Sequence, residues 1–361
     1  MNILIIKLSA LGDVVHTLPA LNALRRHHPD AHISWLVEEA AKDLVEGHPA
    51  LDRVIVWPRR RFEQAFKSGR LVTAWRLFAE TRRQLRQLPF DLAIDFQGLM
   101  KSGLWMAQAS SRRKAGFGPG MQRSEGSHFF LNEKVPAVSM EIHALERGLR
   151  LLNALGVPTG PVEYRLPVRP EAYQAVEDFL SSIRVKPEDT LVAIHPFTRW
   201  ETKHWFNDRF AAVADALIDQ GKKAVFTGGP ADGAKLDDIA GRMKHPMLRA
   251  DRLGGLPQLA ALLERATAMI TTDTGPMHIA AAMGTPVVAI FGPTSPQRTG
   301  PHGEQHVVLH SGVPCSPCFR KDCLTNLVEP MGCMKRISVE AVLEAVVRIG
   351  SPARAFTGTK A

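Results

Sequence analysis

The sequence has no apolar run long enough to cross a membrane, and its basic runs are not interleaved with aromatic residues. Aromatic residues make up 7% of the chain, and no nucleic-acid-binding motif accompanies the basic runs at 59–61, 82–83 and 112–114. We therefore expect no nucleic-acid partner. The apolar first residues contain Lys7, are followed by Asp13 and lack a small-residue cleavage site. They predict a buried strand rather than a signal peptide, and hence a cytoplasmic protein.

Two common nucleotide-binding motifs are also missing. No G-x-G-x-x-G follows the first predicted strand, and the spacing of Gly116, Gly118 and Gly120 does not match it. There is no G-x-x-x-x-G-K-[ST] either. These absences argue against hydride transfer and against P-loop phosphoryl transfer.

Cysteine is scarce, and the four cysteines of the chain lie in one short segment with the spacing C-x2-C-x4-C-x9-C: Cys315, Cys318, Cys323 and Cys333. Four thiolates so close could hold zinc or an iron–sulfur cluster, although the spacing matches no common zinc module. A cytosolic location disfavours a standing disulfide. We expect no required cofactor and a structural role for the segment, with a structural metal or free thiols as the two alternatives.

The 361 residues exceed the usual size of one core, and 45% of them are hydrophobic, so two globular domains are expected. The positive charge is uneven. Residues 1–165 contain 23 basic and 16 acidic side chains, which gives +7 of the total +9. This half favours an anionic partner such as a phosphorylated substrate or an acidic lipid; a merely solvated basic face is the other interpretation.

Apolar strands and helical patterns alternate along the chain. Strands are predicted at 2–8, 32–37, 53–57, 92–95 and 114–116, and helices from the turn at 9–13 to about 27, then at 62–87, 102–109 and 141–155. A linker rich in proline and glycine covers 156–170, after which the alternation restarts. We predict a Rossmann-like first domain at 1–165, a second at 171–337, and a C-terminal helix and tail at 338–361.

Residues 269–292, MITTDTGPMHIAAAMGTPVVAIFG, predict a strand, a tight turn, a short helix and a second strand. Asp273 or Thr274 can cap the helix, and Gly275 lets a ligand approach the backbone. The free N–H groups at the helix start, with His278 one turn in, suit an anion such as a diphosphate. A well-capped crossover helix without a ligand is the alternative.

Polar loops follow several predicted strands. In parallel sheets ligands bind beyond the carboxyl ends of the strands, so these loops predict a cleft with an anionic ligand on one wall. They contain Ser9, Gly12 and Asp13; Asp95–Gly98; Thr198, Arg199 and Lys203; Gly228–Asp232; and Asp273–Gly275. Asp13 could cap a helix, or act as a general base that takes a proton from a sugar hydroxyl. Arg199 and Lys203 could balance the charge that grows on a departing nucleotide, or simply lie on the surface.

Three segments, IIKLSALGDVVHTLPAL, DFQGLMKSG and TTDTGPMHIAAAMGTPVVAIFGPTSP, together resemble the bacterial lipopolysaccharide core heptosyltransferases, glycosyltransferase family nine. The first is most similar to the type I enzymes. The resemblance covers nearly the whole chain and implies a GT-B fold, with two Rossmann-like doubly wound parallel-sheet domains facing a central cleft. It also implies inverting, metal-independent transfer of heptose from ADP-heptose to the Kdo of lipid A, in lipopolysaccharide inner-core biosynthesis at the inner membrane surface.

The resemblance also assigns roles to residues. Asp13 matches the proposed general base. Donor-binding positions are Ser9, Gly12, Thr198, Arg199, Lys203, Asp232, Asp273, Thr274, Gly275 and His278, and acceptor-binding positions are Arg61, Lys101, Arg123 and His143. Other hypotheses are a family-nine enzyme such as heptosyltransferase II that acts on a heptosylated core, a nucleotide-sugar epimerase of GT-B fold, and a non-catalytic binder in which Asp13 only caps a helix.

Overall fold

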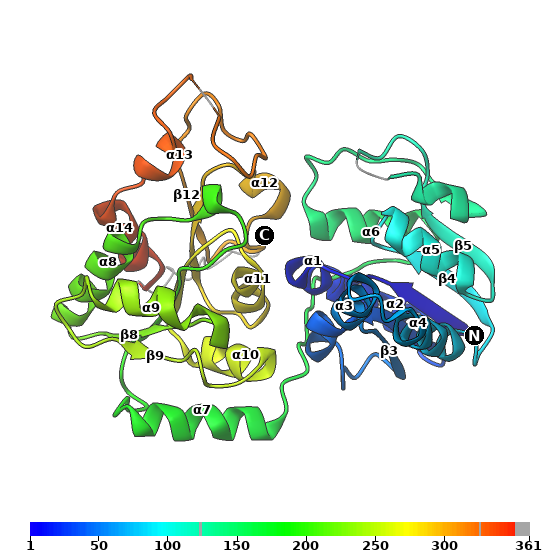
Figure 1. Ribbon diagram of the computed structural model, residues 1–361, viewed down its shortest axis with the longest axis horizontal. Coiled ribbons are helices and arrows are strands. Elements are labelled where there is room, and N and C mark those ends of the chain that lie inside the picture. The colour runs from blue at the N-terminus through cyan, green and yellow to red at the C-terminus, as the bar shows by residue number, and fades with distance from the viewer. Residues whose placement is uncertain (123–124, 325, 351–361) are drawn as a thin grey trace, which may run out of the picture. The chain divides into compact units, whose positions relative to one another are not determined.

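Each half of the chain contains a parallel sheet with helices on both faces (Figure 1). The computed structural model describes residues 1–122, 125–324 and 326–350. The chain divides into two compact units, Met1–Pro167 and Val168–Ala361. Both units are Rossmann-like, which confirms the predicted α/β class with two doubly wound parallel sheets. No helix in the described part of the chain is long and apolar enough to cross a membrane.

The first unit has the sheet order β3-β2-β1-β4-β5-β6, with every pair parallel. The direction of strand addition reverses between β1 and β4, so this is where a ligand is expected in such a sheet. Its elements are β1 (Asn2–Ile6), α1 (Leu11–Val15), α2 (Leu18–His27), β2 (His32–Glu38), η1 (Glu39–Leu44), β3 (Arg53–Trp57), α3 (Arg59–Lys67), α4 (Leu71–Leu85), β4 (Phe90–Asp95), α5 (Met100–Gln108), β5 (Ser111–Phe117), η2 (Ser127–Phe130), β6 (Glu133–Val135) and α6 (Ala144–Ala154).

The second unit repeats this plan, with the order β12-β11-β10-β7-β8-β9 and the reversal between β7 and β10. Helix α14 packs against α8 and the strands β10 to β12, so it is part of this unit. Its elements are α7 (Pro170–Ser182), β7 (Leu191–His195), η3 (Glu201–Lys203), α8 (Asn207–Asp219), β8 (Lys223–Phe226), η4 (Pro230–Asp232), α9 (Gly233–Ala240), β9 (Leu248–Arg249), α10 (Leu256–Arg265), β10 (Ala268–Thr272), α11 (Gly275–Ala282), β11 (Val287–Phe291), α12 (Pro296–Thr299), β12 (Val307–His310), α13 (Gly332–Lys335) and α14 (Val339–Gly350).

The central strands are apolar on both faces because helices cover both faces. Leu4 and Ile6 of β1 are fully buried in the same core cluster as an aromatic group from β3 and α5. In this group Trp57 contacts Trp105, with ring centroids 4.9 Å apart. Phe62 of α3 lies 4.9 Å from Trp57, and Phe78 of α4 lies 5.2 Å from Trp105. These rings fasten α3 and α4 to the sheet.

Two predicted helices are each divided in two. The prediction of one helix over 62–87 is wrong, because Gly69 adopts a left-handed φ of +70° and ends α3. The N–H of Arg70 donates to the carbonyl of Ala65, which satisfies the last turn of α3 before α4 begins. The prediction of one helix up to residue 27 is also wrong. Pro19 lies in the first turn of α2 and has no N–H to continue the hydrogen bonds of α1.

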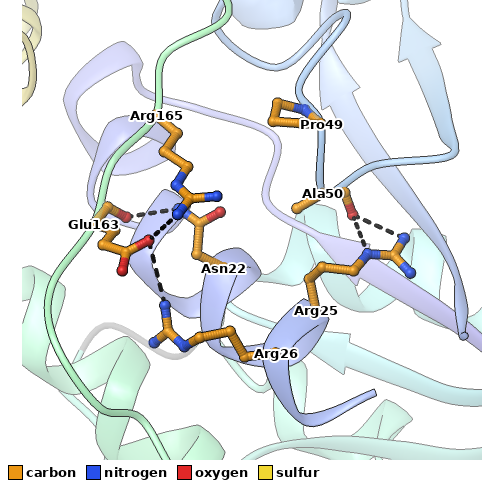
Figure 2. Close-up of a pocket in the computed structure, with 7 residues that line it drawn as sticks. All are labelled: Asn22, Arg25, Arg26, Pro49, Ala50, Glu163 and Arg165. Carbon is orange, nitrogen blue, oxygen red and sulfur yellow. Dashed lines mark hydrogen bonds and ion pairs between the residues drawn. The ribbon is translucent and has the colours of Figure 1, made fainter. Parts of the chain in front are cut away.

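The segment that ends the first unit is held to α2 (Figure 2). The side-chain amide of Asn22 donates to the carbonyl of Glu163 at 2.7 Å. The carboxylate of Glu163 pairs with Arg165 at 2.9 Å and with Arg26 at 3.6 Å. A cavity of about 90 Å³ lies among these side chains and Arg25, whose guanidinium pairs with Asp52. Each of these three arginines is already paired with a carboxylate, and Glu163 serves two of them.

Candidate functional site

In the first unit, the polar groups gather where β1 and β4 end, at the reversal of strand order. The side-chain oxygen of Gln97, after β4, accepts from the N–H groups of Leu8 and Ser9, after β1, at 3.1 Å each. Buried Asp95 accepts from the N–H groups of Gln97 and Gly98 at 2.9 and 3.0 Å. Burial raises the pKa of Asp95, while these hydrogen bonds oppose the rise. The two strand ends thus form one connected network.

The predicted residues Ser9 and Lys101 belong to this network. The ammonium of Lys101 donates to the Ser9 hydroxyl at 2.5 Å and to the Glu38 carboxylate at 2.9 Å. Glu38 ends β2 and is buried, with Arg59 at 3.5 Å on its other oxygen. Sequence reasoning missed Glu38 as a site residue. The available signal was its position at the carboxyl end of a strand adjacent to β1.

Asp13 lies in the first turn of α1 and is half-buried. One of its carboxylate oxygens accepts from the N–H of Ala10 at 3.1 Å, and Gly12 beside it is buried. The neighbouring Lys7 is buried and donates to the carbonyl of Phe96 at 3.0 Å. Burial lowers the pKa of Lys7, although the charge of Asp13 opposes this effect. Asp13 therefore lies at a helix start, as expected of a capping residue. It also lies near the charge of buried Lys7, which the sequence analysis did not consider.

The predicted acceptor residues in the described part of the chain lie on three different elements. His143 forms the N-cap of α6, and its ring lies 4.9 Å from the ring of buried His16. Arg61 is exposed on α3, and in the described ranges it makes neither an ion pair nor a side-chain hydrogen bond. Arg123 lies outside the described residues. Lys101 is the acceptor candidate that the structure ties to the network at the end of β1.

In the second unit, three side chains connect the loops after β7, β10 and β11. The ammonium of Lys203 lies 2.6 Å from a carboxylate oxygen of Asp273, and the Thr294 hydroxyl donates to the same oxygen at 2.6 Å. Asp273 and Thr294 are buried. The prediction included Lys203 and Asp273 but missed Thr294, which lies in the PTSP sequence after β11. The lysine is thus held by a carboxylate at the reversal of strand order.

Helix α11 starts directly after Asp273. Thr274 is its N-cap residue, in extended conformation and without a side-chain capping bond. Gly275 and Pro276 form the first turn, and His278 is buried one turn further on. Since the first N–H groups of a helix have no partner within it, the start of α11 provides donors beside the Lys203–Asp273 pair.

The remaining predicted donor residues of this unit lie on the loop after β7 that also carries Lys203 and on the loop after β8. Arg199 is exposed and Thr198 is half-buried, both between β7 and Lys203. Asp232 accepts from the N–H of Gly229 at 2.9 Å. His195, at the end of β7, is buried, and its Nδ1 lies 3.0 Å from the Thr227 hydroxyl. Burial lowers the pKa of His195 to about 4, against the opposing charge of Asp232.

The cysteine segment packs beside these loops. All four cysteines line one cavity of about 390 Å³, and burial raises the pKa of Cys333 to about 11. Across the described ranges, no three His, Cys, Asp or Glu side chains are arranged to hold a metal ion. The thiols are free. The segment contacts the loops after β7 and β11. The Thr202 hydroxyl donates to the carbonyl of Arg320 at 2.7 Å, and the N–H of Phe319 donates to the carbonyl of Pro293 at 2.8 Å.

Comparison with known proteins shows which family the chain belongs to. Residues 78–328 match the family model for glycosyltransferase family 9 (heptosyltransferase). The chain is 33% identical to lipopolysaccharide heptosyltransferase 1 of Pseudomonas aeruginosa over 90% of its length and 87% of that protein. It is 28% identical to the enzyme of the same name from Escherichia coli K12, over 86% of the chain and 94% of that protein.

Among solved structures, E. coli heptosyltransferase WaaC with ADP matches with a TM-score of 0.77 and 24% identity, over 97% of this chain and 100% of that one. The family 9 glycosyl transferase of Veillonella parvula matches with a TM-score of 0.78 and 24% identity, over 96% of both chains. The fold is therefore that of the GT-B heptosyltransferases. With two Rossmann-like units, polar networks at both strand-order reversals and a family match over most of its length, the chain is a glycosyltransferase that belongs to family 9, the heptosyltransferases.

Proposed function

We propose that the protein transfers heptose from ADP-heptose to the Kdo of lipid A, with inversion at the anomeric carbon. The observation that carries this proposal is the Lys203–Asp273–Thr294 group beside the start of α11. At a strand-order reversal, a lysine and the N–H groups of Gly275 and Met277 in the first turn of α11 suit a diphosphate. ADP and a fluorinated ADP-heptose are named in the solved structures of the similar E. coli enzyme. The names of the curated relatives favour heptosyltransferase I over an enzyme that acts on a heptosylated core or an epimerase.

In this proposal Asp273 positions Lys203 instead of contacting the donor. One carboxylate oxygen already accepts from both Lys203 and Thr294, so the lysine side chain is fixed before the donor arrives. Lys203, exposed Arg199 and the N–H groups of α11 then offset the charge on the departing ADP. Asp232 and Thr198 lie on the loops expected to contact the nucleoside and the phosphates.

Asp13 is the proposed general base. It accepts the proton of the acceptor hydroxyl while that oxygen forms a bond to the anomeric carbon, and ADP leaves with the electron pair of the broken C–O bond. The hydrogen bond from the Ala10 N–H holds one carboxylate oxygen, which leaves the other for the acceptor. No metal is needed in this scheme, because side-chain cations and helix N–H donors supply the positive charge.

Release of ADP tests the proposal. Purified protein is mixed with ADP-heptose and Kdo-lipid A, and in parallel with a heptosylated acceptor or with no acceptor. We expect ADP release with Kdo-lipid A and little in the other two mixtures. Faster release with the heptosylated acceptor would assign the protein to a later step, and conversion of ADP-heptose without any acceptor would indicate an epimerase.

We also place the protein at the cytoplasmic face of the inner membrane as a peripheral protein, since its acceptor is a lipid.

A further inference from the structure

Four large apolar side chains are exposed around the turn that joins α3 and α4: Phe66, Leu71, Val72 and Trp75, here called the α3–α4 apolar patch. Each is between 59% and 66% exposed. Leu71, Val72 and Trp75 lie in the first turns of α4, and Phe66 lies in the last turn of α3, on the other side of Gly69. Large exposed apolar groups that gather in one place mark an interaction surface.

The fold does not need this patch for its core. Ala65 of α3 and Ala74 of α4 occupy the buried positions at this end of the helix pair. Phe62 and Phe78 make the aromatic contacts that fasten the two helices to the sheet. The patch residues remain exposed at the edge of that packing, where the ring of Phe66 stacks on Phe62 at 6.3 Å and the ring of Trp75 lies 5.8 Å from Phe78. Helices α3 and α4 lie side by side (Figure 1).

Positive charge surrounds the patch. Between residues 59 and 79 the sequence contains six basic residues and one acidic residue, Glu63, which is paired with Arg59 at 2.7 Å. The other five are exposed, and over the described residues their side chains make neither ion pairs nor hydrogen bonds: Arg60, Arg61, Lys67, Arg70 and Arg76. Apolar groups in the middle of unpaired cations suit a partner with an apolar interior and an anionic surface.

We propose that the α3–α4 turn docks on the surface of a bilayer that contains anionic phospholipid. The patch residues enter the region between headgroups and acyl chains, where tryptophan is favoured, and Lys67, Arg70 and Arg76 pair with lipid phosphates. This inference rests on the proposed function only in that the acceptor is a lipid. It adds the surface that makes the contact and the charge of the lipid that it selects. A nucleic acid would use the cations but not the four apolar side chains.

Co-sedimentation with vesicles tests the docking separately from catalysis. The vesicles contain phosphatidylcholine alone or phosphatidylcholine with phosphatidylglycerol, and neither contains lipid A. One variant combines Leu71→Ser, Val72→Ser and Trp75→Ser, and a second combines Lys67→Gln, Arg70→Gln and Arg76→Gln. The matched controls are Phe129→Ser, which replaces an aromatic residue that is 77% exposed elsewhere in the first unit, and a combination of Arg112→Gln, Arg150→Gln and Arg252→Gln, which removes the same charge from other sites.

We expect the wild type to sediment with vesicles that contain phosphatidylglycerol and to bind vesicles of phosphatidylcholine alone only weakly. The second variant should bind roughly a hundredfold less tightly, because each basic residue near an anionic surface contributes on the order of 1 kcal/mol. The affinity of the first variant for these vesicles should fall at least about tenfold, and both controls should bind like the wild type. The proposal would be overturned if the variants bound vesicles as tightly as the wild type, or if the controls lost as much vesicle binding as the variants. Self-association of the wild type through the patch would also overturn it.

A soluble assay distinguishes this outcome from failure of the proposed function. ADP release from ADP-heptose is measured with a lipid-free Kdo acceptor and no vesicles. Both patch variants should retain the wild-type rate in that assay and the wild-type thermal unfolding temperature. If the wild type binds vesicles but releases no ADP, the docking surface is supported and the proposed reaction is wrong. If it releases ADP but does not bind vesicles, the proposed reaction is supported and the docking surface is wrong.

Discussion

The carboxylate of Asp13 is held at the start of α1 by one hydrogen bond from the Ala10 N–H. An asparagine can accept the same bond, so Asp13→Asn should preserve the helix start and remove only the basicity. We expect the rate of ADP release to fall by roughly a hundredfold or more, with the affinity for ADP-heptose within a few fold of wild type. Calorimetric titration and the ADP-release assay measure the two quantities. The exposed substitution Asp30→Asn is the control, and a wild-type rate in Asp13→Asn would exclude the proposed base.

Asp273 holds Lys203 where both side chains are largely removed from solvent, with 8% and 16% of their surfaces exposed. Asp273→Asn leaves a nearly buried ammonium without its counter-charge, and the free energy of unfolding should fall by roughly 3 kcal/mol. The matched control is Glu329→Gln, which breaks the more exposed Lys335–Glu329 pair and should cost less than about 1 kcal/mol. Urea unfolding of the two variants and the wild type gives both values. Similar losses in both variants would show that Lys203 does not depend on Asp273.

Buried His195 should make the second unit sensitive to acid. Its pKa is lowered to about 4 by burial, whereas the ring in the unfolded chain takes up a proton near the ordinary value of 6.5. The neutral ring therefore contributes stability that is fully present above pH 6.5 and is lost as the pH falls from 6.5 to about 4. The loss amounts to roughly 3 kcal/mol.

Urea unfolding over this pH range checks the size of the loss. His195→Asn should flatten the dependence, because asparagine can still bond the Thr227 hydroxyl but does not titrate. An unchanged slope in His195→Asn would contradict the assignment.

At the scale of elements, the break between α3 and α4 depends on Gly69. Its φ of +70° is unfavourable for any residue with a Cβ, although an added Cβ would meet no atom within 4 Å. Gly69→Ala should therefore lower the free energy of unfolding by about 1 kcal/mol through the backbone alone. The control is Gly148→Ala inside α6, where the new Cβ would lie 3.7 Å from Phe96, an ordinary contact. That change should be stabilising by up to about 1 kcal/mol. Thermal unfolding measures both, and equal signs would refute the explanation.

The central strands and the order of the elements could be predicted from the sequence, because strands buried on both faces are continuous apolar runs such as NILII and VVAIF. The sequence did not reveal the edge strands β6, β9 and β12, which have only two to four residues each. These strands form because a preceding strand is available to pair with them. Element bounds at Gly69 and Pro19 were missed because the apolar spacing continues across both breaks.

The same limit applies to the site. Motifs local in sequence predicted Asp13, Lys203 and the Asp273–His278 segment, each next to a strand end or a helix start. Glu38 and Thr294 were missed because their partners, Lys101 and Asp273, come from other strands and become neighbours only when the sheets form. The pairing of Lys203 with Asp273 likewise joins two loops, and the local motif alone does not suggest it.

At the scale of the whole molecule, the two units share one strand order. Apart from Ser9 and Gly12, the groups proposed to bind the donor lie in the second unit. Hydrogen exchange on the full chain tests this assignment. ADP at about a hundred times its Kd should stabilise the second unit by about 2.7 kcal/mol and slow its globally exchanging core amides, such as those of β7 and β10, about a hundredfold. The core amides of β1 and β4 should be unaffected. AMP at the same concentration should protect much less, because one phosphate engages fewer of the N–H groups at the start of α11. Protection by ADP confined to β1 and β4 would move the donor site to the first unit and would remove the basis for the role given to Lys203.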